Sequence, residues 1–169
     1  MKDRLKCNGE LVSIHGHKMH IYVRGDQNAP AIVFMAGHCT VAPVYDFKVL
    51  YDKLLPYFKV IVIEKYGYGY SDVWESSCDI DTLVSLQRQA LALVQETGPY
   101  FLAPHSMSGL EAIRWKQQYP EEVSGIIGID MATPLSFSVW TNEEIQKTVR
   151  LMRILRGLRL GSILTSLNN

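Results

Sequence analysis

Hydrophobic and polar positions follow two alternating patterns from residue 31 to residue 130. Short continuous apolar runs, typical of strands buried on both faces of a sheet, occupy residues 31–36, 60–63, 100–103 and 123–129. Between these runs the apolar residues recur at helical spacing, in Tyr45–Phe58, Thr82–Glu96 and Leu110–Trp115. Strand and helix alternate three times, which predicts an α/β protein with a mostly parallel sheet and right-handed crossover helices.

The first segment of the chain shows a different pattern, with apolar and polar residues alternating. Leu11–Ile14 and Met19–Val23 are two short runs of this kind, so they predict a pair of antiparallel strands. His15, His17 and His20 fall in and beside the turn between them. Their spacing is compatible with metal binding, but no acidic or cysteine residue is nearby in the sequence. Solvated polar positions on a strand pair are therefore favoured, and no metal site is predicted.

The pattern changes again after Pro134. Thr141 and the residues after it form a helix start, and arginines flank an apolar stripe at helical spacing. We therefore expect two parts, residues 1–134 and residues 135–169. A core helix and a helix on a membrane surface are alternatives for the second part. The stripe consists of Ile145, Val149, Met152 and Leu155.

Composition narrows the class of protein. Of 169 residues, 47% are hydrophobic and 20% charged, as in an ordinary soluble globular protein. Lys+Arg and Asp+Glu both number 17, so no overall field attracts nucleic acid or an acidic membrane. The 3 cysteines are far apart, which indicates reduced thiols and not disulfides or a zinc site. With no apolar signal segment or membrane span in the sequence, we expect a cytoplasmic protein without integral membrane contact.

One stretch, FLAPHSMSGLEAIRW, carries the candidate chemistry. An apolar run ends at Pro104, Ser106 follows, and small residues at Ser108 and Gly109 open a helical segment. This predicts a strand, a sharp turn and a helix with Ser106 at the apex. Such a turn holds a hydroxyl clear of the backbone beside amide donors, which a serine nucleophile requires. The alternative is a serine that only caps a helix.

The stretch resembles the nucleophile elbow of the α/β-hydrolase superfamily, G-x-S-x-G in its usual form, with Pro104 and Ser108 in place of the two glycines. The resemblance covers Leu11–Asp130. It implies an α/β-hydrolase-like fold, a mostly parallel sheet with helices on both faces that lacks the C-terminal strands of the family. It also implies that a helical cap over the active site begins after Pro134.

The resemblance also implies roles for individual residues. Ser106 would be the nucleophile of a hydrolase of ester, amide or similar acyl substrates, with no cofactor. The backbone amides of Met107 and His38 would form the oxyanion hole. An ordinary glycine loop after a strand is the alternative for Gly37-His38. The segment EKYGYGYSD, beginning at Glu64, resembles the family's D-x-x-G-x-G-x-S loop and is interpreted as structural.

The expected catalytic base is missing from the sequence. In this fold the triad order is Ser, acid, His, yet no histidine follows Ser106. Asp130 is a possible acid. We therefore expect the 169 residues, as a fragment or a natural short form, to be nearly inactive. A non-catalytic binding or interaction module is the alternative function, and a base donated by a partner chain is a further one.

Two kinds of partner are predicted, and nucleic acid is not among them. The first is a small-molecule acyl substrate, which the sequence does not specify further. The second is another copy of the chain, because the run Val123–Ile129 would form an exposed, flat, apolar sheet edge that favours dimerisation or aggregation.

Overall fold

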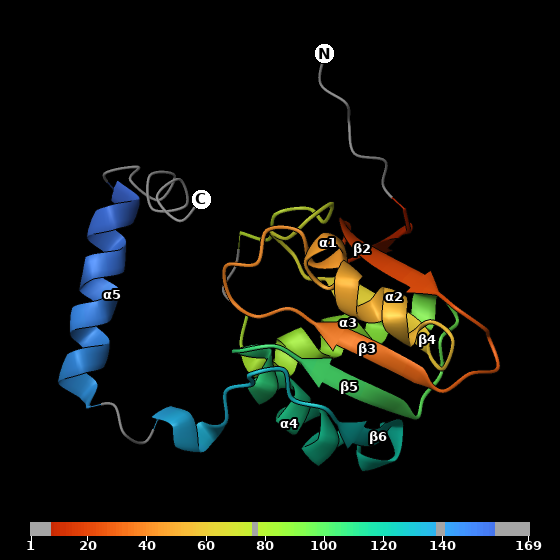
Figure 1. Cartoon of the computed structure of the whole chain (residues 1–169). Coiled ribbons are helices and arrows are strands. Elements are labelled where there is room, and N and C mark those ends of the chain that lie inside the picture. Colours follow the sequence, from red (N-terminus) through yellow and green to blue (C-terminus); the bar gives the residue numbers. More distant parts are fainter. Residues whose placement is uncertain (1–7, 76–77, 138–140, 158–169) are drawn as a thin grey trace. The chain divides into compact units, whose positions relative to one another are not determined.

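The computed structural model of the protein describes residues 8–75, 78–137 and 141–157. The chain divides into two compact units, residues 1–133 and residues 134–169. The described residues of the first unit form a sheet, four α-helices and a short 3-10 helix, Pro120–Glu122, drawn from red to blue-green in Figure 1. Its strands are β1 Glu10–Ile14, β2 His17–Arg24, β3 Ala31–Met35, β4 Lys59–Glu64, β5 Tyr100–Pro104 and β6 Val123–Ile126. Its helices are α1 Pro43–Asp46, α2 Lys48–Leu54, α3 Ile80–Leu93 and α4 Ser108–Gln118.

The six strands form one sheet in the order β1-β2-β4-β3-β5-β6. β3 pairs in parallel with both β4 and β5, and β6 extends the parallel part beyond β5. β1 and β2 are antiparallel, as are β2 and β4. The expected mostly parallel sheet and the N-terminal antiparallel pair are confirmed. β3 lies between β4 and β5, so the segments that follow these three strands meet at one edge of the sheet.

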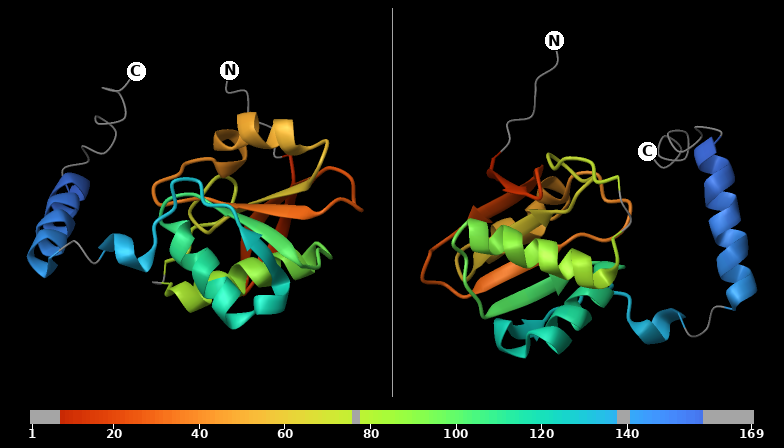
Figure 2. Two further views of the ribbon diagram at one scale, coloured as in Figure 1. Left: turned by 60° about the horizontal axis from the view of Figure 1, so that its bottom comes forward. Right: turned by 180° about the vertical axis from the view of Figure 1, so that it is seen from behind.

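Each face of the sheet has its own hydrophobic core, because successive side chains of a strand point to opposite faces. On one face, Phe34 and Val62 pack with Phe47 and Tyr51 from the region of α1 and α2. On the other face, side chains such as Met35 pack with residues of α3 and α4. Figure 2 shows α3 and α4 on the side of the sheet opposite to α1 and α2, which confirms helices on both faces.

Two element boundaries differ from the expectation. The helix predicted over Tyr45–Phe58 is two short helices that begin earlier, because Pro43 suits the first turn of a helix. The strand predicted over Val123–Ile129 is regular only to Ile126. A register shift interrupts its pairing with β5, and glycines in this segment weaken regular strand structure.

The second unit contains the helix α5, Asn142–Gly157, at the position where the sequence predicts one. Val149, Leu151 and Ile154 on this helix are exposed. Within the described residues, no helix is both long and apolar enough to cross a bilayer. The expectation of a cap remains a prediction, and the chain beyond Gly157 lies outside the described residues.

Candidate active site

Ser106 lies at the bend between β5 and α4. It follows the last residue of β5 by two positions and precedes the first residue of α4, Ser108, by two. Its backbone has φ +52°, in the left-handed region that a non-glycine residue adopts only when the surrounding structure imposes it. The side chain is partly exposed. The sequence-predicted turn is therefore present, and Ser106 is not in the interior of the helix.

Hydrogen bonds from neighbouring segments fix this bend. The Ser106 carbonyl accepts from the N–H of Gly109 at 3.0 Å and from that of Ala132 at 2.8 Å. The Ser106 N–H donates to the Ile129 carbonyl at 3.3 Å. Hydrogen bonds to α4 and to the segment after β6 thus fix the backbone of Ser106, and none of these bonds uses the Ser106 hydroxyl.

Ser108 occupies the position where the resembling motif has glycine. Its side chain is fully buried, and its hydroxyl lies 2.7 Å from the Met35 carbonyl and 2.8 Å from the His105 carbonyl. Met35 ends β3, so this hydroxyl connects the bend to the strand that leads into the Gly37 loop. Serine therefore fits at this position in place of glycine, because its side chain is small and its hydroxyl has hydrogen-bond acceptors in the interior.

The loop after β3 lies directly against Ser106. A Cβ added to Gly37 would be 2.8 Å from the Ser106 Cβ and 2.9 Å from the His105 carbonyl, so only glycine fits at this position. Within the described residues, the backbone N–H groups of His38 and Met107 donate to no other backbone carbonyl. These two amides are therefore available as donors, and their role in an oxyanion hole remains a prediction.

The histidine side chains make contacts other than with the Ser106 hydroxyl. The His105 ring packs edge-on against Phe47, on the face covered by α1 and α2. His38 is exposed, and His17 packs against Tyr66 and Trp74. Within the described part of the chain, no hydrogen bond joins a histidine ring to Ser106. The geometry therefore provides a candidate nucleophile and candidate amide donors without an aligned base.

Asp130 lies close to the bend in the fold. The preceding residue, Ile129, accepts the hydrogen bond from the Ser106 N–H and forms a parallel bridge with His105. Asp130 itself has φ +45° and an exposed side chain. The structure thus brings Asp130 to the same edge of the sheet as Ser106, and its role as the acid remains a prediction.

The expectation that His20 is solvated is wrong. Its side chain is fully buried, and Nδ1 lies 2.9 Å from a carboxylate oxygen of Glu64, which is also fully buried. Glu64 comes from β4, 44 residues along the chain, so the acidic partner cannot be found near His20 in the sequence. Among the described residues, no group of three or more potential ligands that could hold a metal ion is present.

Glu64 holds together the loops beside the site. Its carboxylate accepts hydrogen bonds from the N–H of Tyr70, at 2.8 Å, and from that of Val44, at 3.3 Å, in addition to its contact with His20. Burial alone would raise the pKa of Glu64, but the hydrogen bond from His20 and those from Tyr70 and Val44 outweigh it. The pKa of Glu64 is therefore lower than usual.

This lowered pKa predicts a dependence of stability on acid. Below the ordinary glutamate pKa of 4.5, the unfolded chain binds a proton at Glu64 that the folded chain excludes. The stabilisation by Glu64 is therefore present above that pH and is lost as the pH falls through the lower folded pKa. We expect urea unfolding between about pH 3 and pH 6 to show a steeper loss of stability in the wild type than in Glu64→Gln. Equal slopes would contradict the role of this carboxylate.

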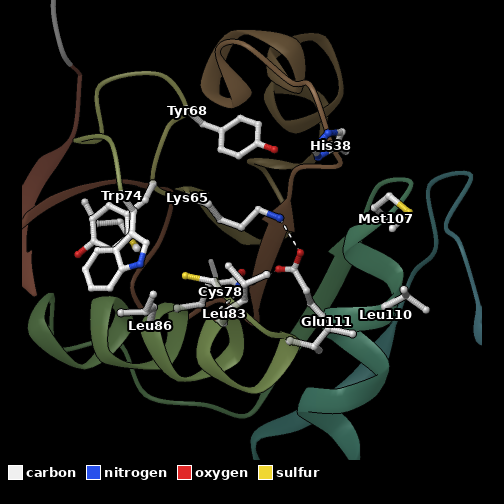
Figure 3. A pocket seen from close by; sticks show the side chains of 14 residues that line it. His38, Lys65, Tyr68, Trp74, Cys78, Leu83, Leu86, Met107, Leu110 and Glu111 are labelled. Atoms are coloured by element: carbon white, nitrogen blue, oxygen red, sulfur yellow. Dashed lines mark hydrogen bonds and ion pairs between the residues drawn. The ribbon is translucent and has the colours of Figure 1, made fainter. Parts of the chain in front are cut away.

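A pocket of about 330 Å³ lies beside the bend, bounded by α3, the start of α4 and the loop after β4. Figure 3 shows His38 and Met107 toward one end of the pocket and Trp74 toward the other. Lys65 and Glu111 meet in its wall, where Nζ donates to Oε1 at 2.6 Å. Sequence reasoning missed this ion pair, because 46 residues separate the two partners and Glu111 has the spacing of an ordinary helix position.

Comparison with known proteins gives the fold. No family model matches the chain. An uncharacterized protein of Bacillus subtilis, YbdG, is 41% identical over 133 residues, which cover 79% of this chain and 41% of YbdG. An α/β-hydrolase-fold protein from Burkholderia ambifaria superposes with a TM-score of 0.64 at 15% identity, covering 76% of this chain and 48% of that protein. The chain has the α/β-hydrolase fold.

A second α/β-hydrolase comparison agrees with the first. The enol-lactonase from Burkholderia xenovorans superposes with a TM-score of 0.63 at 18% identity, covering 69% of this chain and 45% of the lactonase. The chain thus spans less than half the length of each of the three proteins.

Proposed function

We propose that the protein is a serine hydrolase acting on esters, amides or similar acyl substrates, with Ser106 as the nucleophile. The observation that carries the proposal is the left-handed backbone of Ser106, at φ +52°, on a bend packed against the Gly37 loop. A strained bend of this kind is a common way to expose a nucleophilic hydroxyl. The similar enol-lactonase makes an ester a reasonable substrate class, since a lactone is a cyclic ester.

The proposed step is acyl transfer to Ser106. The Ser106 oxygen attacks the substrate carbonyl carbon while its proton passes to a base. The carbonyl oxygen becomes an oxyanion that the N–H groups of Met107 and His38 stabilise. When the tetrahedral intermediate collapses, the bond to the alkoxide or amine breaks and an acyl-enzyme remains. Loss of the base alone typically costs several powers of ten in rate, so the chain alone should react slowly.

Added imidazole tests the proposal by supplying the missing base. We expect a fluorophosphonate probe to modify Ser106 slowly in buffer and at least about tenfold faster with imidazole, because imidazole takes the hydroxyl proton. Intact-protein and peptide mass spectrometry measure the extent and the position of labelling. Ser106→Ala should abolish the labelling, whereas Ser124→Ala, which changes an exposed serine on β6, should not. Labelling that persists in Ser106→Ala, or none in the wild type with imidazole, would refute the proposal.

A non-catalytic binding module is the second candidate. It is favoured by the lack of any hydrogen bond between a histidine and Ser106 in the described residues, together with the pocket beside the bend. This candidate predicts that imidazole does not induce labelling at Ser106 while small ligands still bind the pocket. The labelling experiment therefore separates the two functions.

A further inference from the structure

We propose that the pocket between α3, α4 and the loop after β4 binds the uncharged apolar part of the substrate, and that the Lys65–Glu111 ion pair makes it select neutral groups over anionic ones. The inference rests on the proposed function only in calling the ligand a substrate. It is supported by the volume of the pocket, by the side chains that line it and by the ion pair in its wall.

The size of the pocket defines the size of the ligand. An apolar cavity of about 150 Å³ is large enough for one benzene molecule, so about 330 Å³ accommodates roughly twelve non-hydrogen atoms. This volume lies at the lower end of the range for ligand pockets. A naphthyl group or an acyl chain of similar size fits this volume, whereas a longer lipid chain would extend beyond it.

The wall is mainly apolar, and most of its apolar side chains come from three segments. α3 contributes Leu83 and Leu86, and α4 contributes Leu110. Trp74, from the loop before α3, closes the end away from the bend in Figure 3. An apolar ligand gains free energy by displacing water from such a wall, in proportion to the apolar area that it covers.

The charged groups in the wall are paired with one another, whereas the buried Trp74 Nε1 and Gln87 Oε1 have no hydrogen-bond partner among the described residues. Glu111 accepts from Lys65 Nζ at 2.6 Å and from Gln87 Nε2 at 2.7 Å. Gln87 Nε2 also donates to the Leu83 carbonyl at 3.1 Å, so both of its hydrogens are used. The positive charge of Lys65 is thus balanced by the carboxylate. An anionic ligand would meet that carboxylate beside Lys65 and lose its own hydration.

The Tyr68 phenol and the Cys78 thiol in the wall carry no charge. Burial raises the pKa of the Tyr68 phenol, and the nearby Cys39 and Glu111 raise it further. Burial raises the pKa of the Cys78 thiol, and Asp79 adds to this. Both groups keep their protons near neutral pH, so they add no charge to the pocket.

The pocket is continuous with the bend that carries Ser106. His38 and Met107, whose amides are the proposed oxyanion donors, both line it. Figure 3 shows their side chains at the same end of the pocket, across from Trp74. A substrate whose carbonyl is held at the two amides can therefore extend its apolar part toward Trp74.

A binding experiment in the Ser106→Ala protein tests the inference without any catalysis. The probes are 2-naphthamide and 2-naphthoate, which have nearly the same shape but differ in charge. Binding is followed by NMR through the indole N–H signal of Trp74, assigned with Trp74→Phe. The Trp115 indole donates to Glu122 at 2.9 Å, is fully buried and does not line this pocket, so its signal is the internal control.

We expect naphthamide to shift the Trp74 signal with at least about tenfold higher affinity than naphthoate. Leu83→Trp, which fills the pocket from α3, should weaken naphthamide binding by at least about tenfold. Leu93→Trp is the matched control, because Leu93 is an exposed leucine on the same helix outside the pocket. No shift of the Trp74 signal, or equal binding by the Leu83→Trp and Leu93→Trp proteins, would overturn the inference.

The role of the ion pair is tested by Glu111→Gln. This change leaves Lys65 without its counter-charge, so we expect naphthoate to bind more tightly than naphthamide. An unchanged preference for naphthamide would show that the pair does not set the selectivity. Naphthamide binding without imidazole-dependent labelling of Ser106 would support the pocket as a binding site and refute the hydrolase function. Imidazole-dependent labelling of Ser106 without naphthamide binding would support the hydrolase function and refute the pocket as a binding site.

Discussion

Replacing Lys65 by methionine is expected to lower the free energy of unfolding by about 3 kcal/mol. The side chains of Lys65 and Glu111 are only 10% and 6% exposed, and they join the end of β4 to α4. Methionine keeps the apolar length of lysine but removes the charge, so Glu111 retains only Gln87 as a hydrogen-bond partner. A buried carboxylate without a counter-charge is costly. Urea unfolding followed by circular dichroism measures the loss.

Two further variants test whether the loss of stability comes from the unpaired Glu111 carboxylate or simply from the removal of a charged side chain. The double variant Lys65→Met/Glu111→Leu removes both charges and should recover at least about half of the lost stability. Arg24→Met breaks the exposed contact with Asp52, where the side chains are 59% and 41% exposed, and should leave the urea midpoint nearly unchanged. If Lys65→Met is as mild as Arg24→Met, the buried pair is screened by solvent and does not stabilise the fold.

The sheet was predictable because its strands are buried on both faces. In β3, Ile32 and Phe34 pack in one core, and Val33 and Met35 pack in the other. Every one of these positions is buried in a core, so a polar residue is not tolerated at any of them. The resulting continuous apolar run is a strong local signal. The irregular end of β6 was not predictable, because the register shift depends on how the strand pairs with β5 and not on its own residues.

The bend was predictable for a similar reason. Pro104, Ser106 and the small residues after it determine the turn locally, and the Gly37 loop follows a strand in the same way. Two of the buried side-chain contacts were not predictable. His20 meets Glu64 and Lys65 meets Glu111 across 44 and 46 residues, and the spacing of residues along the chain carries no information about such contacts.

Alanine at Gly109 is expected to destabilise the protein by about 2 kcal/mol, although alanine in a helix normally stabilises it relative to glycine by about 1 kcal/mol. A Cβ at this position would lie 2.2 Å from the Ala132 carbonyl oxygen. This backbone cannot simply move away, because the Ala132 N–H donates to the Ser106 carbonyl at 2.8 Å. The clash should therefore be transmitted to the bend. Urea unfolding measures the loss of stability.

The same variant should also lose at least about tenfold of the imidazole-dependent labelling at Ser106, because the hydroxyl and the proposed oxyanion donors are displaced relative to one another. Gly16→Ala is the matched control for a glycine substitution. Gly16 lies in the turn between β1 and β2, with φ +82° and open space around the added Cβ, so alanine there brings backbone strain without a clash. It should lose stability but keep its labelling rate. Normal labelling in Gly109→Ala would mean that the close contact between α4 and residue 132 does not position the nucleophile.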